Sequence, residues 1–330
     1  MKKELIAILL LILTALAETA APAGDKSAQT AALVERAHDA SDIRAPGSPP
    51  FHLEADVDLV MPDSPPVHGT VVMNWAAEDQ WREDIEIPGY NCVVVENHTQ
   101  HWRKSAAPYE PFSVFEALTS LVTYPEKFSE KGARVRQRTD GATSLECAEA
   151  RTAYGDKHEY CVDAATGYLA SDHDGTVWYD YANFAAAGKR WFPQTARVFL
   201  AGRPVAEVHI VRLSMGADLS PSLFAPLTGP DVRSLSDCKD GKIKPAKAIY
   251  SPAPPYPLAL RHLGEQGTVV MWATIGTDGL PYGLTVLHSA GADLDPLAVA
   301  TVRQWRYKPT TCGGVPIDVQ TQISVHFALR

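Results

Sequence analysis

The clearest pattern in the chain is a strict alternation of side chains close to its end. Between residues 317 and 329 every second position suits a buried face, and polar residues fill most of the gaps. A period of two over this length predicts a β-strand with one buried face and one wet face. A strand this long in a small sheet usually leaves part of its backbone edge unpaired. The positions of the buried face are Ile317, Val319, Thr321, Ile323, Val325, Phe327 and Leu329.

The segment before this strand predicts the rest of a small module. Residues 267–275 alternate like a second strand, and the turn residues 276–279 lead into a return strand that ends at His288. Asp295 is the expected N-cap of a helix, with Pro296 at its first position. The pattern is therefore strand, hairpin, helix and final strand.

An earlier short helix is expected over residues 257–263, closed by Gly264. With this helix, the segment 255–330 resembles the TonB C-terminal domain family, and residues 236–254 form a Pro-containing linker in front of it. The matching positions are Tyr256, Pro257, Gly267, Asp278, Gly279, Asp295, Trp305, Pro309, Gly314 and Phe327.

This resemblance implies a two-helix, three-stranded antiparallel fold. It also implies a partner, an outer-membrane TonB-dependent transporter, and a role in energy-coupled transmembrane transport. The contact that the family implies is β-augmentation, in which an extended peptide adds a strand to a sheet edge. The candidate edge residues are Ile317, Asp318, Val319, Gln320, Thr321, Gln322 and Ile323. The alternative is a fully paired strand in a structural domain.

The start of the chain has the features of a signal peptide over residues 1–17. Lys2 and Lys3 precede an apolar run of about a dozen residues, and small residues follow at a cleavage-type site. The run is short for a bilayer span, which needs about 20 residues. We therefore expect a periplasmic protein, with an inner-membrane anchor formed by residues 5–17 as the alternative. A working transducer would need such an anchor.

Residues 18–235 predict a separate β-rich domain. After a helix over 31–42, four short strands with tight turns over 51–96 indicate an antiparallel meander. Residues 112–122 have helical spacing, and further strand-like runs follow as far as residue 213.

This strand rhythm resembles the LolA/LolB-like lipoprotein-carrier superfamily. The residues that carry the resemblance are Gly69 to Trp75, Gln80 to Arg82, Gly89 and Tyr90, Trp102, and the run from Phe192 to Leu213. It implies an α+β fold, with a curved antiparallel half-barrel and helices in its concavity. The concavity would either take an acyl chain or be filled by its own helix.

Charge differs between the two parts of the chain. The net charge is −9 overall, yet residues from Lys239 onward hold nine Lys or Arg against six Asp or Glu. The first domain is therefore acidic, which disfavours nucleic acid as a partner.

The five cysteines predict two disulfides in an oxidising compartment. Cys147 and Cys161 flank a turn symmetrically, so a hairpin would place them opposite each other. Cys238 and Cys312 precede the module and its last strand, and a bond between them would pin the linker. Cys92 is left as a buried thiol.

No motif for catalysis, phosphate binding or a structural metal occurs in the sequence. His98 and His101 have metal-like spacing but fall between strands without a third ligand, so surface histidines are the preferred interpretation. The sequence therefore predicts no enzyme, no cofactor and no metal site.

Overall fold

The computed structural model describes residues 26–60, 65–107, 109–122, 133–152, 155–234 and 243–329. The predicted signal peptide, residues 1–17, and Cys238 lie outside the described residues. Among the helices that are described, none is long and apolar enough to cross a membrane.

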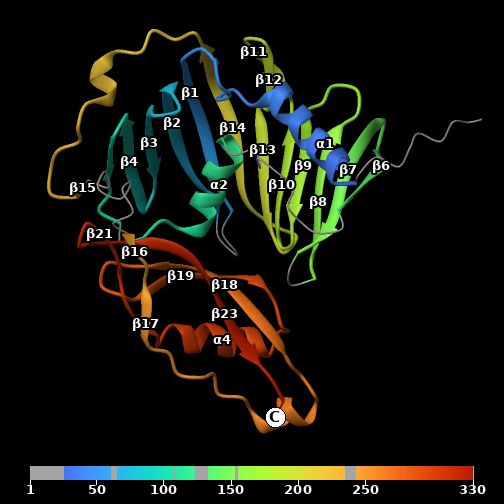
Figure 1. Cartoon of the computed structure of the whole chain (residues 1–330), viewed down its shortest axis with the longest axis vertical. Helices are drawn as coiled ribbons and strands as arrows, with labels where there is room; N and C mark the ends of the chain where they lie inside the picture. Colours follow the sequence, from blue (N-terminus) through green and yellow to red (C-terminus); the bar gives the residue numbers. More distant parts are fainter. Residues whose placement is uncertain are drawn as a thin grey trace, which may run out of the picture.

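The first part of the chain forms one curved antiparallel sheet of 13 strands, in the order β15-β5-β4-β3-β2-β1-β14-β13-β10-β9-β8-β7-β6 (Figure 1). Its two end strands, β15 and β6, do not pair, so the sheet is an open half-barrel. The strands are β1 (Phe51–Leu59), β2 (Val67–Ala77), β3 (Gln80–Ile87), β4 (Tyr90–Asn97), β5 (Gln100–Lys104), β6 (Arg134–Asp140), β7 (Thr143–Arg151), β8 (Lys157–Asp163), β9 (Leu169–Asp174), β10 (Val177–Ala182), β13 (Thr195–Leu200), β14 (Arg203–Met215) and β15 (Val232–Ser234). A separate hairpin is made by β11 (Ala185–Ala187) and β12 (Arg190–Phe192).

Alternation along the strands decides which face of the half-barrel is buried. In β1, Phe51, Leu53, Ala55 and Val57 are at most 2% exposed, whereas the polar residues between them are half-buried. Burying one such large side chain contributes roughly 1.5–3 kcal/mol. The inward row therefore fixes the register of the central strands.

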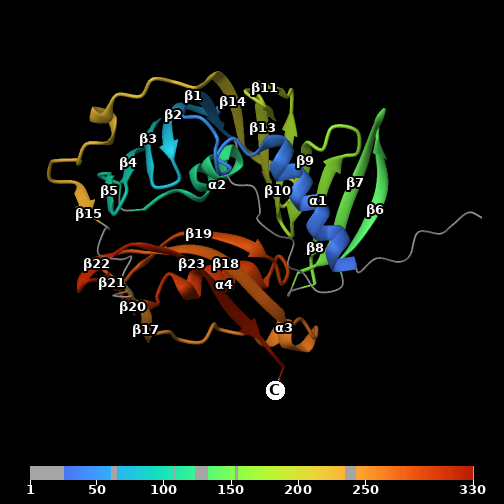
Figure 2. The ribbon, with the colours of Figure 1, turned by 45° about the horizontal axis from the view of Figure 1, so that its top comes forward.

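Two helices cover the same inner face of this sheet. Tyr160, Asp172, Tyr179 and Val198 are successive cross-strand neighbours from β8 to β13, so their side chains share one face. Tyr160 packs in a cluster with α1 (Lys26–Ser41), and Val198 packs in a cluster with α2 (Phe112–Val122). Figure 2 shows the sheet arching over α2. Outside this face, the short 3₁₀ helix η1 (Pro221–Phe224) contacts β3 and β4.

The C-terminal module contains the three-stranded sheet β19-β18-β23 and two helices. These elements are α3 (Leu258–His262), β18 (Gly267–Ile275), β19 (Pro281–His288), α4 (Leu294–Val302) and β23 (Val319–Phe327). One face of the sheet packs on α4, with Met271, Leu294 and Ala298 fully buried between them. This arrangement and the open half-barrel confirm the predicted α+β fold class.

Two small sheets complete the module. One joins β16 (Ile243–Lys244), β21 (Thr310–Cys312) and β22 (Val315–Ile317), and the other joins β17 (Lys247–Tyr250) and β20 (Arg306–Lys308). Strands β16 and β17 fall within the segment that the sequence presents as a linker. They pair with strands of the module.

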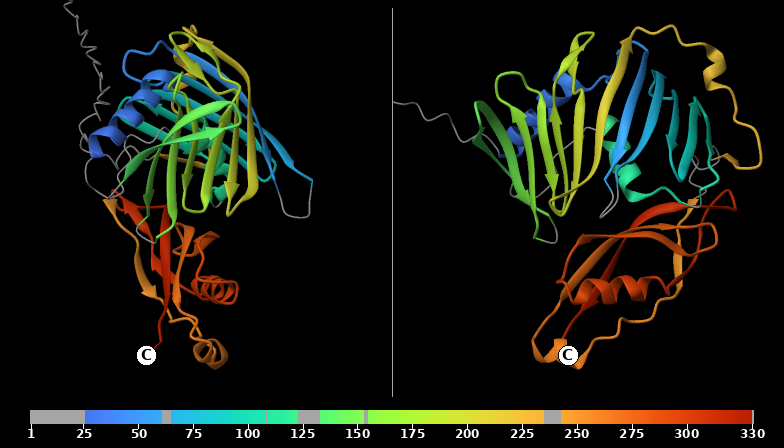
Figure 3. Two further views of the ribbon diagram at one scale, coloured as in Figure 1. Left: turned by 90° about the vertical axis from the view of Figure 1, so that its right-hand side faces the viewer. Right: turned by 180° about the vertical axis from the view of Figure 1, so that it is seen from behind.

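The face of the module sheet opposite α4 lies against the open side of the half-barrel (Figures 1 and 3). Trp272 of β18 contacts two rings of α2, with centroid distances of 5.6 Å to Phe112 and 4.6 Å to Phe115. Beside them, Tyr282 of β19 stacks on Tyr109 at 5.5 Å. Aromatic pairs at these separations contribute about 0.5–1.5 kcal/mol beyond their buried area.

The structure corrects two sequence predictions in the module. The last strand does not run unbroken from 317 to 329, because Ile317 pairs with Thr310 in the small sheet while β23 begins at Val319. The chain thus changes sheets at Asp318. The N-cap of α4 is Asp293, not Asp295. The Asp295 carboxylate instead turns back to accept hydrogen bonds from the Ser289 hydroxyl at 2.6 Å and the Ala290 amide at 3.0 Å.

Candidate functional site

The edge of the module sheet at β23 is the first candidate site. β23 pairs with β18 over its whole length, from Gly267 opposite Phe327 to Ile275 opposite Val319. Within the described residues no other strand pairs with β23, so its second backbone edge is open. An open edge presents N–H and C=O groups that another extended chain can use.

The predicted edge residues divide into two groups in the structure. Ile317 and Asp318 precede β23, whereas Val319 to Ile323 form its first half. Of these, Asp318 and Gln320 contact the half-barrel: the Gln320 amide donates to the Glu110 carboxylate at 2.8 Å, and Asp318 pairs with Arg103. Gln322, further along, is exposed. The start of the edge therefore lies at the junction of the two parts, and the rest extends beyond it.

The positions that carry the TonB resemblance serve the turns and the core of the module. Tyr256 packs edge-on against Phe327, with ring centroids 5.6 Å apart, and Pro257 is the N-cap of α3. At the hairpin, the Asp278 carboxylate accepts from the Leu280 amide at 2.9 Å. Gly279 has a φ of 77° and lies so close to the Tyr307 carbonyl that a Cβ would clash.

The remaining positions of this set lie at strand ends and turns. Gly267 begins β18 beside Ala290, where an added Cβ would approach the Ala290 Cβ to 2.9 Å. The Trp305 indole donates to the Pro252 carbonyl at 3.1 Å. Pro309 lies between β20 and β21, and Gly314 turns the chain with a φ of 94°.

The second candidate site is a cavity of about 610 Å³ at the junction of half-barrel and module. Its half-barrel wall comes from the inner faces of β2 to β5 and from α2, and its module wall comes from β18 and residues 317–320. About half of the lining residues are apolar or aromatic, and they include Met73, Trp75, Trp81, Ile85, Val94, Phe115 and Leu118. Volumes of roughly 300–1,000 Å³ are typical of small-molecule sites.

Glu83 places a carboxylate within this apolar lining. It lies on the inward face of β3, directly opposite Met73 on one neighbouring strand and Val94 on the other. The residue is only 9% exposed. Burial, and then the nearby Glu110 carboxylate, raise the pKa of Glu83 to about 7. A group of this kind holds a proton near neutral pH unless a cation compensates its charge.

The other ionisable groups of the cavity lie where the module meets β4 and β5. Burial raises the pKa of Glu110, which accepts from Gln320, and burial also raises the pKa of Tyr90. Arg103 donates to the Tyr90 hydroxyl at 3.0 Å. Arg103 and Arg233 both pair with Asp318 of the module. These contacts connect the cavity wall to the start of β23.

The sequence predicts a concavity in the half-barrel, but not the wall that the module adds to it. One signal was visible, because Glu83 occupies an inward position in the alternation that Trp81, Ile85 and Ile87 otherwise fill. An inward carboxylate on a strand with a buried face indicates either a buried ion pair or a ligand site.

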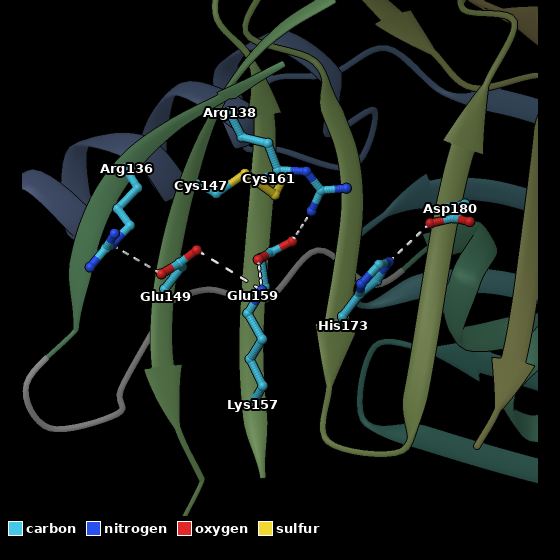
Figure 4. A network of polar contacts seen from close by, with 9 residues as sticks. All are labelled: Arg136, Arg138, Cys147, Glu149, Lys157, Glu159, Cys161, His173 and Asp180. Atoms are coloured by element: carbon cyan, nitrogen blue, oxygen red, sulfur yellow. Dashed lines mark hydrogen bonds and ion pairs between the residues drawn. A yellow bond between two sulfur atoms is a disulfide. The ribbon is translucent and has the colours of Figure 1, made fainter. Parts of the chain in front are cut away.

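The predicted disulfide between Cys147 and Cys161 is present and joins neighbouring strands β7 and β8 (Figure 4). Glu159 lies beside it, but the two sulfurs are bonded to each other and offer no thiolate to a metal. The Glu159 carboxylate is held by Arg138 and Lys157. This cluster is therefore a structural crosslink within a network of ion pairs.

The other two described cysteines and the two histidines with metal-like spacing have structural roles. Cys92 is a buried free thiol, as predicted. Cys312 is disulfide-bonded, and the predicted partner Cys238 lies outside the described residues. His98 lies 3.0 Å from an Asp79 oxygen, and His101 lies 2.7 Å from a Glu96 oxygen.

Residues 252–329 match the family described as Gram-negative bacterial TonB protein C-terminal. Protein TonB of Vibrio cholerae is 31% identical over 88 residues, which cover 26% of this chain and 36% of that protein. Protein tonB2 of Pseudomonas aeruginosa is 30% identical over 83 residues, covering 25% and 31%. The chain thus spans about a third of the length of these relatives. The resemblance predicted for the module is confirmed.

Solved structures with similarity to the chain fall into two groups. The C-terminal domain of TonB from Pseudomonas aeruginosa is 26% identical, with a TM-score of 0.24, and the match covers 28% of this chain and 90% of that one. A LolA superfamily protein from Nitrosomonas europaea is 12% identical, with a TM-score of 0.41, and the match covers 60% and 97%.

Proposed function

We propose that the chain is a periplasmic partner-binding protein whose C-terminal module contacts an outer-membrane transporter by β-augmentation along β23. The observation that carries this proposal is the open edge of β23 in a module whose sequence matches the TonB C-terminal family. An extended peptide beside β23 would form main-chain hydrogen bonds, each contributing roughly 0.5–1.5 kcal/mol net. The proposal assigns no catalytic step to the chain.

The geometry favours the part of β23 from Thr321 onward as the first contact. Thr321 and Gln322 lie beyond the junction, and Gln322 is exposed, whereas Asp318 and Gln320 are engaged by the half-barrel. A peptide that pairs along the whole edge would meet the half-barrel at Val319. Binding over residues 321–327 needs no such rearrangement.

The test is a titration of the isotope-labelled full chain with a ten-residue peptide from the plug segment of a TonB-dependent transporter, followed by backbone NMR. Shifts should concentrate on β23 and on β18 behind it. The matched control is the same peptide with N-methyl groups on alternate residues, on the side that faces the strand. Equal binding of both peptides would contradict β-augmentation, since N-methylation removes the donors but keeps the side chains.

Energy coupling in transmembrane transport is the finer part of the proposal. It requires the chain to be anchored in the inner membrane, where a proton-driven motor could act on it. N-terminal sequencing of the mature protein decides this: retention of Met1 supports an anchor at residues 5–17, and a start near Glu18 supports a periplasmic accessory protein.

The second candidate function is a lipid or lipoprotein carrier with the module as its docking part. The apolar cavity at the junction favours it, because α2 does not fill the whole concavity. Native mass spectrometry of the full chain should then show an acyl ligand that co-purifies. A protein that is always ligand-free would speak against a carrier, but would leave the β23 proposal untouched.

A further inference from the structure

Glu83 is a buried carboxylate without a hydrogen-bond or ion-pair partner among the described residues. Its neighbours across the sheet are Met73 and Val94, and its neighbours along β3 on the same face are Trp81 and Ile85. Glu83 is only 9% exposed. Within the described part of the chain, its carboxylate forms no hydrogen bond and no ion pair. A buried carboxylate without such partners is costly, and a cationic group from outside the chain would compensate its charge.

A second unpartnered polar group lies buried in the opposite wall of the cavity. Thr274 of β18 lines the cavity and is 2% exposed. Its hydroxyl is buried without a hydrogen-bond partner among the described residues. Glu83 belongs to the half-barrel and Thr274 to the module, so polar groups from both parts of the chain lie in the cavity wall.

We propose that the junction cavity is a binding site for a small amphipathic molecule that carries an ammonium group, with Glu83 as its counter-ion and Thr274 as a second acceptor. This inference refines the carrier candidate and does not depend on the open edge of β23. An ammonium group supplies several N–H donors, which suits a carboxylate and a hydroxyl together.

The walls favour a cation over an anion. The indoles of Trp75 and Trp81 line the cavity near Glu83, and aromatic faces attract cations. Glu110 adds a second carboxylate. Two arginines of the lining, Arg103 and Arg233, pair with Asp318, and Arg103 also attracts Glu110, so two carboxylates balance these two cations.

Arg44 is the third guanidinium group of the lining and attracts Glu83 electrostatically. Its positive charge offsets part of the negative charge of the carboxylates in the lining. Three carboxylates and three guanidinium groups lie in the lining, so a single ammonium group suits the site better than a dication would. The volume of about 610 Å³ suits a compact or single-chain apolar body.

The test compares three probes with the same ten-carbon chain, using calorimetry on the full chain at pH 8 and probe concentrations below micelle formation. Decylamine carries the ammonium group, 1-decanol is neutral and decanoate is anionic. We expect decylamine to bind at least tenfold more tightly than the other two. In Glu83→Gln this advantage should fall about tenfold, while the affinity for 1-decanol stays the same.

The matched control is Glu86→Gln on the same strand. Glu86 is exposed and does not line the cavity, so the decylamine affinity should not change. Thr274→Val, which keeps the shape of the side chain, should weaken decylamine binding a few-fold. Circular dichroism of each variant checks that it remains folded.

Cys92 reports where the probe binds, because this buried thiol lines the same cavity. Saturating decylamine should slow the alkylation of Cys92 by N-ethylmaleimide in the wild type, but not in Glu83→Gln at the same concentration. The same alkylation in the presence of 1-decanol, as a control, should show little protection of Cys92.

Two sources could supply such a ligand, a free amine or the ethanolamine headgroup of a lipid, and a lysophosphatidylethanolamine arm distinguishes them. Tighter binding of the lysolipid than of decylamine identifies a lipid, and weaker binding identifies a free amine. Equal affinities for decylamine and 1-decanol, or an unchanged decylamine affinity in Glu83→Gln, would overturn the proposal. Failure of every probe to bind would overturn it as well.

Discussion

Asp318 of the C-terminal module forms an ion pair with Arg103 of the half-barrel, with 3.5 Å between the Asp318 Oδ2 and Arg103 Nη1 atoms. Both side chains are less than a fifth exposed, and Arg233 pairs with the same carboxylate. Because Asp318 lies at the point where the chain passes from β22 to β23, this pair joins the candidate edge to the cavity wall. A change at one site can therefore act on the other.

Asp318→Asn should weaken the docking of the module on the half-barrel. The substitution leaves two arginines without their carboxylate, and we expect a cost of about 2 kcal/mol, in the range for charged hydrogen bonds that are partly buried. Small-angle scattering should show a larger radius of gyration, and the emission of Trp272 should shift to the red as its ring leaves Phe112 and Phe115.

Asp293→Asn is the control for this variant. Asp293 is exposed and forms no side-chain cap, so neither the radius nor the emission should change. Identical scattering curves for Asp318→Asn and wild type would show that the ion pair does not hold the module in place.

The pH dependence of stability should be reduced in Glu116→Gln. Burial raises the pKa of Glu116 from its usual 4.5 to about 7, and the carboxylate accepts a hydrogen bond from the Tyr179 hydroxyl. The folded state therefore keeps a proton that the unfolded state loses, so the free energy of unfolding falls between pH 4.5 and pH 7. At pH 8 the variant should be more stable than wild type by about 2–3 kcal/mol, and at pH 4.5 the two should be nearly equal.

Urea unfolding at several pH values measures this difference. Glu83 contributes a slope of the same sign, so the variant keeps part of the pH dependence. The exposed Glu86→Gln serves as a control without effect. A Glu116→Gln variant that is less stable than wild type at pH 8 would contradict this prediction. It would mean that the ionised carboxylate stabilises the folded state.

Decylamine affinity should rise with pH between 6 and 8. The amine stays protonated, with an ordinary pKa near 10, while Glu83 ionises through about 7 in the empty cavity. We expect an increase of up to about tenfold across this window. Charges from neighbouring elements act on the same carboxylate: Glu110 and Asp84 raise its pKa, and Arg44 lowers it. In Glu83→Gln the affinity should be nearly flat, and a slope that persists there would have to come from Glu110.

Removal of the Cys147–Cys161 disulfide should destabilise the half-barrel. The bond closes a loop with a sequence separation of 14, for which chain-entropy arguments give about 3 kcal/mol. The double substitution to Ser should lower the urea midpoint accordingly. Cys92→Ala, which leaves the bond intact, is the matched control, and equal midpoints for the double variant and wild type would count against a stabilising role.

Local patterns determined much of this fold. Period-two alternation gave β1 and β23 their buried faces, and turn residues placed the hairpins, because these features depend on neighbours along the chain. The disulfide between Cys147 and Cys161 was predictable for the same reason, since the two cysteines lie opposite each other in one hairpin. The resemblance of residues 255–330 rested on motifs in one short segment.

Contacts between distant segments were decided only in three dimensions. The alternation does not show that the chain changes sheets at Asp318, where the carboxylate pairs with Arg103 and Arg233, more than 80 residues away. Asp295 fits an N-cap by local rules, yet its carboxylate binds Ser289 and Ala290 in the fold. The inward position of Glu83 is visible in the sequence, but the cavity around it exists only because the module closes over the half-barrel. The free energy of this closure comes from the packing of complementary surfaces on distant segments. No local sequence pattern determines that complementarity.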